Sequence, residues 1–135
     1  MNQVDGKPTS KTIIYPELSY QVMGLLFKIH TKLGPAYQEK YYQRAIETEL
    51  AQSQIPYERE KFIQLKYQET PIGKYFLDFI IDNKLILETK SIDYFTRKDY
   101  RQVMAYLNAT KLKLAILVNF NSSRLIHNRI VNPRI

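Results

Sequence analysis

Two apolar segments joined by three polar residues constrain the fold of this chain more than any other feature. The segments are Tyr75–Ile81 and Leu85–Lys90, and Asp82-Asn83-Lys84 lies between them. Two short apolar runs around a polar loop predict a β-hairpin. Both arms are apolar on both faces, which is typical of strands in the middle of a sheet that is covered on each side.

Helices on either side of this hairpin can supply that cover. Apolar residues recur with helical spacing in three segments, at 16–33, 37–54 and 96–108. Pro16 is favoured at a helix start, and Thr96 with Asp99 has the spacing of a helix-capping pair.

Three further segments have the composition of strands. One follows Pro56 and ends at a predicted turn over Thr70–Gly73, and the others are predicted at 113–120 and 124–131, the last at a sheet edge. The element order is α-α-β-β-β-α-β-β, an α/β (α+β) arrangement. Residues 1–12 are polar and aperiodic, so we expect a flexible N-terminal tail before a single domain at 13–135.

Composition and charge exclude several classes of function. The 135 residues include no cysteine, which excludes disulfides, thiolate zinc sites and cysteine nucleophiles and agrees with a cytoplasmic location. No segment approaches the roughly 20 apolar residues of a membrane span, so no membrane association is expected. The formal net charge is +7, and from Ser91 onward there are 8 basic residues against 2 acidic ones. This asymmetry favours an anionic partner, most commonly nucleic acid.

Charged residues interrupt the apolar strands at Asp78, Glu88 and Lys90. If Asp82-Asn83-Lys84 forms the loop, Asp78 lies opposite Glu88, with their Cβ atoms roughly 5 Å apart. Strand alternation then places all three side chains on one face. Two carboxylates this close repel each other, and Mg²⁺ or Mn²⁺ between them would remove the repulsion.

A lysine beside such a metal can order an attacking water and stabilise charge that develops on a phosphate. Asp78, Glu88 and Lys90 together are therefore suited to phosphodiester hydrolysis. An alternative is that Lys90 forms an ion pair with either carboxylate and only stabilises the sheet. The spacing alone does not decide between these interpretations.

Three more residues are candidates for the same site. Gln102 and Tyr106 are four residues apart and share a helix face, although Tyr106 alone would be interpreted as a core aromatic. Glu39 lies near a predicted helix N-terminus, where the helix dipole stabilises a carboxylate and no catalytic role is needed. It could equally be a further metal ligand.

Taken together, these residues resemble the PD-(D/E)XK nuclease superfamily and, within it, the small prokaryotic proteins of the GxxExxY family. The resemblance spans about 15–121 and is carried by five motifs: HTKLGPAYQEKYYQRAIETEL, GKYFLDFIID, LILETKS, QVMAYL and LAILVNFN. One departure is Ala36, which replaces the glycine of GxxExxY, so we expect altered backbone geometry at that helix start rather than lost chemistry.

The resemblance implies a restriction-endonuclease-like fold, with a mixed central sheet flanked by helices, and a Mg²⁺- or Mn²⁺-dependent deoxyribonuclease. It implies these roles: metal ligation by Asp78, Glu88 and the Thr89 carbonyl, activation of water by Lys90, a helix-borne carboxylate at Glu39, and positioning by Gln102 and Tyr106.

Nucleic acid, with DNA favoured, is the expected partner. The candidate phosphate contacts are basic residues of the C-terminal part: Arg97, Lys98, Arg101, Lys111, Lys113 and Arg124. A homodimer is expected, because two sites would cut two strands. The rival hypotheses are a nucleic-acid-binding module with the same fold that is silent or partner-dependent, and a structural protein whose ion pairs only specify the sheet register.

Overall fold

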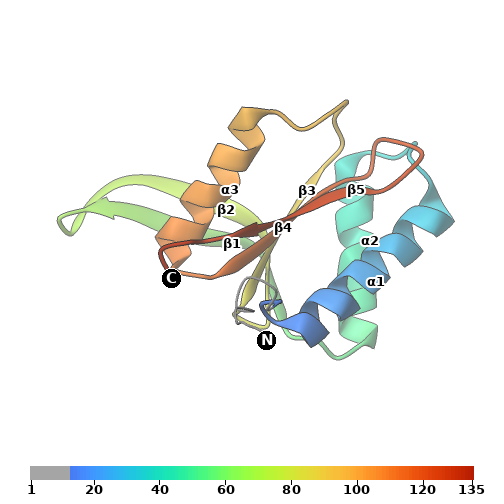
Figure 1. Cartoon of the computed structure of the whole chain (residues 1–135), viewed down its shortest axis with the longest axis horizontal. Coiled ribbons are helices and arrows are strands. Elements are labelled where there is room, and N and C mark those ends of the chain that lie inside the picture. Colours follow the sequence, from blue (N-terminus) through green and yellow to red (C-terminus); the bar gives the residue numbers. More distant parts are fainter. Residues whose placement is uncertain (1–12) are drawn as a thin grey trace, which may run out of the picture.

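The computed structural model describes residues 13–135; the tail predicted for 1–12 lies outside the described residues. Figure 1 shows a twisted sheet with helices on both faces. The helices are α1 (Pro16–Leu33), α2 (Glu39–Gln52) and α3 (Arg97–Thr110). The strands are β1 (Tyr57–Tyr67), β2 (Thr70–Ile81), β3 (Leu85–Lys90), β4 (Leu114–Asn119) and β5 (Ile126–Val131). The predicted element order is confirmed.

The sheet has the spatial order β1-β2-β3-β4-β5. Strand β3 runs parallel to β4, and every other neighbouring pair is antiparallel, so the sheet is mixed as predicted. A parallel pair needs a crossover connection, which α3 supplies between β3 and β4. Strand β5 is an edge strand, as predicted.

Helices α1 and α2 cover one face of the sheet and α3 covers the other (Figure 1). The α1–α2 layer buries Phe79 and Leu87 of the central strands, whereas the α3 layer buries Ile80 and Ile86. Successive residues of β2 and β3 therefore enter different cores, which is why both arms of the hairpin are apolar on both faces.

Local signals explain where the helices begin. Thr96 and Asp99 form the predicted capping box at the start of α3. Before α2, Gly34 has φ 73°, a conformation that glycine adopts at no steric cost, and its carbonyl accepts a hydrogen bond from the Tyr42 hydroxyl. Ala36 does not have a positive φ, so the alanine there is unstrained.

The prediction of a turn over Thr70–Gly73 was wrong. The turn is Gln68-Glu69, which have φ values of 49° and 69°, and Thr70–Gly73 belong to β2. Pro71 is tolerated there because β3 pairs only with the other end of β2, at Phe79–Ile81. The early part of β2 therefore forms a projecting ribbon with β1 (Figure 1) and is exposed rather than central.

Among the described residues, none of the helices has the length and apolar character needed to cross a bilayer.

Candidate active site

The site is built where the β2–β3 backbone ladder stops. The paired register is Ile81↔Leu85, Ile80↔Ile86 and Phe79↔Leu87, which confirms the predicted three-residue loop. The next residues in register are Asp78 and Glu88, but here the hydrogen bonds of the backbone N–H groups are accepted by side-chain carboxylates and not by backbone carbonyls. The Asp78 N–H donates to Glu88 Oε1 at 2.9 Å, and the Thr89 N–H donates to Asp78 Oδ2 at 2.9 Å. Two carboxylates thus occupy a gap between the strands.

An irregularity in β1 and β2 directs Asp78 into this gap. Leu77 and Ile80 both pack in the α3 layer although they are three residues apart, a spacing that regular alternation would place on opposite faces. Across the ribbon, Glu60 has φ 52° and does not pair with β2, although Arg59 and Lys61 on either side of it do. The Asp78 carboxylate therefore lies beside Glu88 in the gap between the strands, whereas the prediction placed both carboxylates with Lys90 on one face of the sheet.

Lys90 is held by α3 and not by the two carboxylates. Its Nζ donates to Gln102 Oε1 at 3.1 Å and lies 3.8 Å from Asp99 Oδ1. Neither Asp78 nor Glu88 forms an ion pair with Lys90 among the described residues, so the alternative in which such a pair explains the three charges is wrong. Asp99, which also caps α3, was missed in the sequence because its spacing from Thr96 explained it fully.

A polar network joins the site to α2. The Thr89 hydroxyl lies 3.0 Å from Asp78 Oδ2 and 3.4 Å from Glu39 Oε2, and it accepts a hydrogen bond from Gln43 Nε2 at 2.8 Å. Gln43 also donates to Glu39 Oε2 at 3.1 Å. Glu39 is the first residue of α2, and Gln43 is one turn further on, so both side chains face Thr89.

Arg59 of β1 completes this network. Its guanidinium donates to Gln43 Oε1 at 2.8 Å and to Glu47 Oε1 at 2.9 Å, while its Nε is buried without a partner among the described residues. Gln43 and Arg59 were missed by sequence reasoning. They are 16 residues apart and in different elements, and no local spacing signals their contact.

The site is an acidic cluster whose charge Lys90 compensates only in part. Burial raises the pKa of Glu88 well above its usual value, and repulsion by Asp78 raises it further. Burial and Asp78 likewise raise the pKa of Glu39. Tyr106 lies in the α3 layer. Its pKa is raised to about 12, mainly by burial and to a smaller extent by the charges of Glu88 and Asp78.

These residues fit a divalent cation. Glu88 is only 4 % exposed, and Lys90 is engaged by α3, so the acidic charge is not neutralised by an ion pair within the gap. In an extended strand the N–H and C=O of one residue point to the same neighbour, so the Thr89 carbonyl also faces Asp78. Carboxylate and carbonyl oxygens are ligands that Mg²⁺ and Mn²⁺ prefer.

The protein does not supply a complete metal cage. Within 13–135, no three His, Cys, Asp or Glu side chains gather closely enough to hold an ion by themselves. Asp78, Glu88 and the Thr89 carbonyl would leave coordination positions for water and phosphate, which is the usual situation for Mg²⁺.

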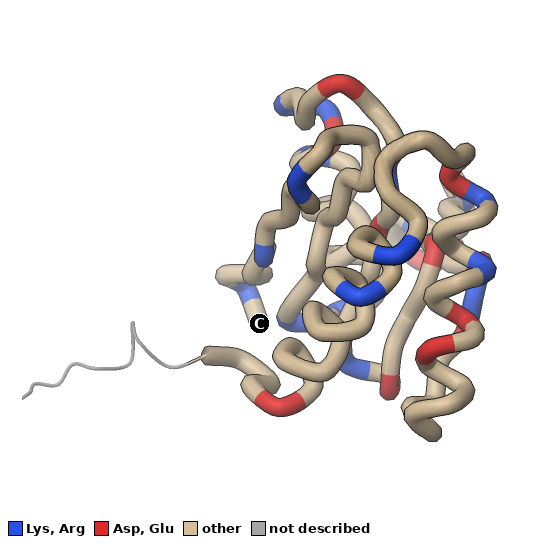
Figure 2. The backbone as a smooth tube through the Cα atoms, turned by 90° about the vertical axis from the view of Figure 1, so that its right-hand side faces the viewer, with Lys and Arg blue, Asp and Glu red and all other residues tan. Residues whose placement is uncertain are grey.

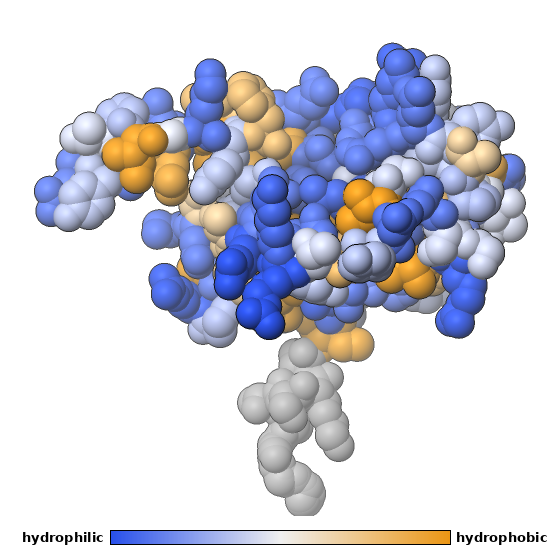
Figure 3. Space-filling view, turned by 90° about the horizontal axis from the view of Figure 1, so that it is seen from above, coloured by the Kyte–Doolittle hydropathy of each residue, from blue (hydrophilic) through white to orange (hydrophobic). Residues whose placement is uncertain are grey.

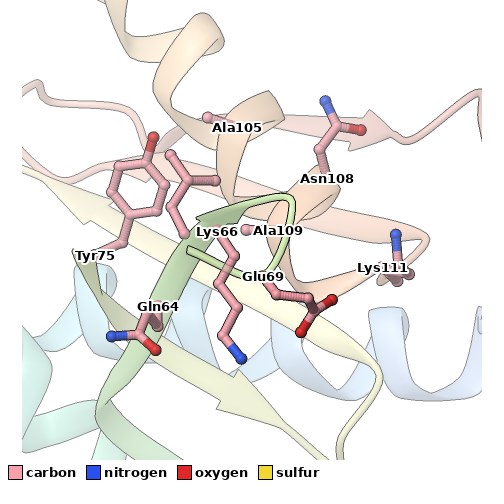
Figure 4. A pocket seen from close by; sticks show the side chains of 9 residues that line it. Gln64, Lys66, Glu69, Tyr75, Ala105, Asn108, Ala109 and Lys111 are labelled. Carbon is pink, nitrogen blue, oxygen red and sulfur yellow. The ribbon is translucent and has the colours of Figure 1, made fainter. Parts of the chain in front are cut away.

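The six predicted phosphate contacts divide into two groups. All are exposed. Arg97, Lys98 and Arg101 lie in the first turns of α3, near Asp99 and Gln102, and Arg124 lies in the loop before β5. Lys111 and Lys113 lie at the opposite end of α3 and of the sheet, and Lys111 lines a pocket between α3 and the β1–β2 ribbon (Figure 4). The structure therefore does not gather Lys111 and Lys113 beside the carboxylates.

The helical layer opposite α3 is not uniformly basic. Figure 2 shows Lys and Arg interspersed with Asp and Glu along α1 and α2. Lys28 of α1 forms an ion pair with Glu49 of α2 at 3.1 Å, and Glu47 of α2 forms one with Arg59 of β1. The α3 side is therefore the better candidate surface for a polyanion.

A mixed sheet between helical layers, with an acidic pair and a lysine at the open end of its central strands, defines a restriction-endonuclease-like domain. The model of the PD-(D/E)XK nuclease superfamily matches residues 16–130. The chain belongs to this superfamily. Membership of the GxxExxY family within it stays a prediction. No curated protein sequence matches the chain.

Two solved structures resemble the fold. SSO0001 aligns with a TM-score of 0.58 and 17 % sequence identity over 87 % of this chain and 60 % of SSO0001. An alkaline exonuclease from Laribacter hongkongensis aligns with a TM-score of 0.52 and 10 % identity, over 91 % of this chain and 73 % of the exonuclease. The chain thus spans less than two thirds of SSO0001, and both likenesses concern the fold.

Proposed function

We propose that this protein is a divalent-metal-dependent nuclease that hydrolyses phosphodiester bonds of DNA at the gap between β2 and β3. The observation that carries the proposal is the pair of carboxylates, Asp78 and Glu88, that replaces the backbone ladder while Lys90 projects beside them. A carboxylate pair that served only the sheet would cost stability, because burying like charges is unfavourable. Membership of the nuclease superfamily supports the same conclusion.

Asp78, Glu88 and the Thr89 carbonyl would hold Mg²⁺ or Mn²⁺. When bound, such an ion acts as a Lewis acid on the phosphate and lowers the pKa of coordinated water. The Lys90 ammonium, kept in place by Gln102 and Asp99, orients the attacking water and stabilises negative charge on the phosphate.

The remaining site residues support this chemistry from both helical layers. Glu39 and Gln43 fix the Thr89 hydroxyl, which donates to Asp78 and thereby orients the carboxylate. Tyr106 closes the α3 side behind Glu88. Exposed Arg97, Lys98 and Arg101 at the start of α3 would contact phosphates of the same strand.

We place the chain in the GxxExxY family on the motif residues Glu39 and Tyr42 and the five segments described above. Tyr42 supports the connection before α2, since its hydroxyl bonds the Gly34 carbonyl and its ring stacks on Phe120. A homodimer, in which two sites act on two strands, is part of the same proposal.

Cleavage of labelled single-stranded, duplex and branched DNA, and of RNA, with Mg²⁺ or Mn²⁺ tests the proposal. We expect cleavage of DNA by the wild type and none by Asp78→Asn, which keeps the side-chain shape but not the charge. A matched control is Asp82→Asn, in the loop at the other end of the hairpin. Equal cleavage by the Asp78→Asn variant would place any activity elsewhere.

A catalytically silent or partner-dependent binding module with the same fold is the second candidate, because the exposed basic residues at the start of α3 would bind nucleic acid whether or not the phosphodiester is cut. It predicts nucleic-acid binding that metal strengthens, with no cleavage of any substrate. Calorimetric titration with Mn²⁺ distinguishes it from a structural role, which predicts no metal affinity in either the wild type or Asp78→Asn.

A further inference from the structure

The projecting β1–β2 ribbon carries two exposed phenylalanines on neighbouring strands. Phe62 and Phe76 are cross-strand partners with ring centroids 5.6 Å apart. Their exposed fractions are 47 % and 56 %, whereas the ribbon residues Ile63, Tyr75 and Leu77 pack toward α3. Figure 3 shows hydrophobic side chains at the surface of this arm. The rings are therefore available to a ligand.

This aromatic pair is continuous with the candidate active site. Phe76 lies two residues before Asp78 on β2, and both line one surface depression together with Glu60 and Leu77. The left-handed conformation of Glu60 interrupts the ribbon at the same level. A strand of nucleic acid whose phosphate lies at Asp78 would thus have a neighbouring nucleotide over the phenylalanines.

The chemistry around the rings suits a nucleotide. The Lys74 ammonium lies 6.0 Å from the centroid of Phe76, where it can neutralise a phosphate beside a stacked base. The two rings expose on the order of 200 Å², whereas a stable protein interface buries about 800 Å² on each partner. The pair is therefore large enough for one or two bases, whereas a second copy of the chain would need about four times the area that the two rings expose.

We propose that Phe62 and Phe76 form a stacking platform for unpaired bases, so that the site takes single-stranded or frayed nucleic acid in preference to intact duplex. Bases inside a duplex are already stacked and offer no free face to a protein ring, whereas unpaired bases do. This inference rests on the proposed function, because it assumes that the neighbouring site of Asp78 and Glu88 is where the strand is cleaved.

Binding measured without metal tests the platform separately from the chemistry. The probe is a fluorescein-labelled 15-nucleotide oligothymidylate in EDTA, with oligouridylate and a 15-base-pair duplex as further probes, read by fluorescence anisotropy. We expect the wild type to prefer the single strands. Phe76→Ala and Phe62→Ala should each weaken single-strand binding roughly 5- to 150-fold, the range for loss of one stacked base.

Matched variants separate stacking from other effects. Phe76→Trp should retain binding, and Phe76→Leu, which is apolar without a ring, should lose it. Tyr20→Ala removes an aromatic that is 81 % exposed on α1 and should change nothing. An abasic residue in the oligothymidylate should weaken binding to the wild type but not add to the loss in Phe76→Ala, because both changes remove the same stack.

Three results would overturn the proposal: equal affinity of the wild type for duplex and single strand, unchanged affinity in both alanine variants, or a change only in oligomeric state by light scattering. The last result would assign the rings to a second copy of the chain. Failure of the proposed function has a different signature, which is absence of cleavage with Mg²⁺ or Mn²⁺ while metal-free binding still depends on Phe62 and Phe76.

Discussion

The two halves of β3 are held in place by different interactions. Leu85, Ile86 and Leu87 pair with both β2 and β4 and are fully buried. Glu88, Thr89 and Lys90 pair with β4 only. On the β2 side, the Asp78 carboxylate accepts from the Thr89 N–H, and the Glu88 carboxylate accepts from the Asp78 N–H of β2. The first half is buried in the apolar core, whereas the second half lacks backbone hydrogen bonds to β2 and borders a polar gap. One six-residue strand thus supplies both the core and the site.

Lys90→Ala should give the largest effect, on turnover alone. Removing a group that stabilises transition-state charge costs about 100- to 1000-fold in rate. Affinity for Mn²⁺, measured by calorimetry, should be retained, because Lys90 contacts Gln102 and Asp99 rather than the carboxylates. A variant that cleaves at the wild-type rate would remove Lys90 from the mechanism.

Leu87→Ala tests the apolar half of the strand. It should lower the free energy of unfolding by about 2–5 kcal/mol, because it leaves a cavity in the α1–α2 core. Thr89→Val is the matched change in the polar half, and it should cost about 1 kcal/mol through the lost hydroxyl bonds to Asp78 and Gln43. Urea denaturation measures both; a larger loss for Thr89→Val would reverse the comparison.

Glu88→Gln should stabilise the metal-free protein at neutral pH by about 0.5–2 kcal/mol, the usual range for stabilising substitutions. Burial and Asp78 raise the pKa of Glu88, so the folded state holds this proton more tightly than the unfolded state. This group's contribution to wild-type stability therefore falls as the pH rises above the usual glutamate value through the raised one. In Glu88→Gln that pH dependence should be absent.

Thermal unfolding in EDTA across this pH interval measures the effect. Added Mn²⁺ should stabilise the wild type and not Glu88→Gln, because ligand binding to the folded state raises its stability. A variant that is less stable than the wild type at neutral pH in EDTA would show that the carboxylate serves the sheet.

Charge removal at the start of α3 should have the smallest effect. Arg97→Ala combined with Lys98→Ala should reduce the slope of log affinity against log salt by about 2, since each phosphate contact contributes about 1. The matched control is Lys111→Ala with Lys113→Ala, at the far end of the helix and sheet. Equal slopes for the two double variants would place the DNA elsewhere on the surface.

Local spacing predicted the framework because its causes are local. The polar loop after Ile81 sets the hairpin register, and with it the approach of Asp78 to Glu88. The Thr96–Asp99 spacing likewise specifies the start of α3. The turn over Thr70–Gly73 was predicted wrongly because Pro71 is usually excluded from strands, and only the short pairing of β3 leaves β2 an open edge there.

Contacts between distant segments could not be predicted in this way. Gln43 reaches Thr89 across 46 residues and Arg59 reaches Gln43 across 16, and neither pair has a characteristic spacing. The partnership of Lys90 with Asp99 and Gln102 depends equally on how α3 packs against the sheet.

Periodicity and loop length were enough to predict the order of the elements, the register of the β2–β3 hairpin and the presence of two carboxylates and a lysine at its end. The partner of each charge and the direction of Asp78 are visible only in the folded molecule. Those depend on the packing of α2 and α3 on opposite faces and on the irregularity at Glu60, and non-local packing leaves no local signature.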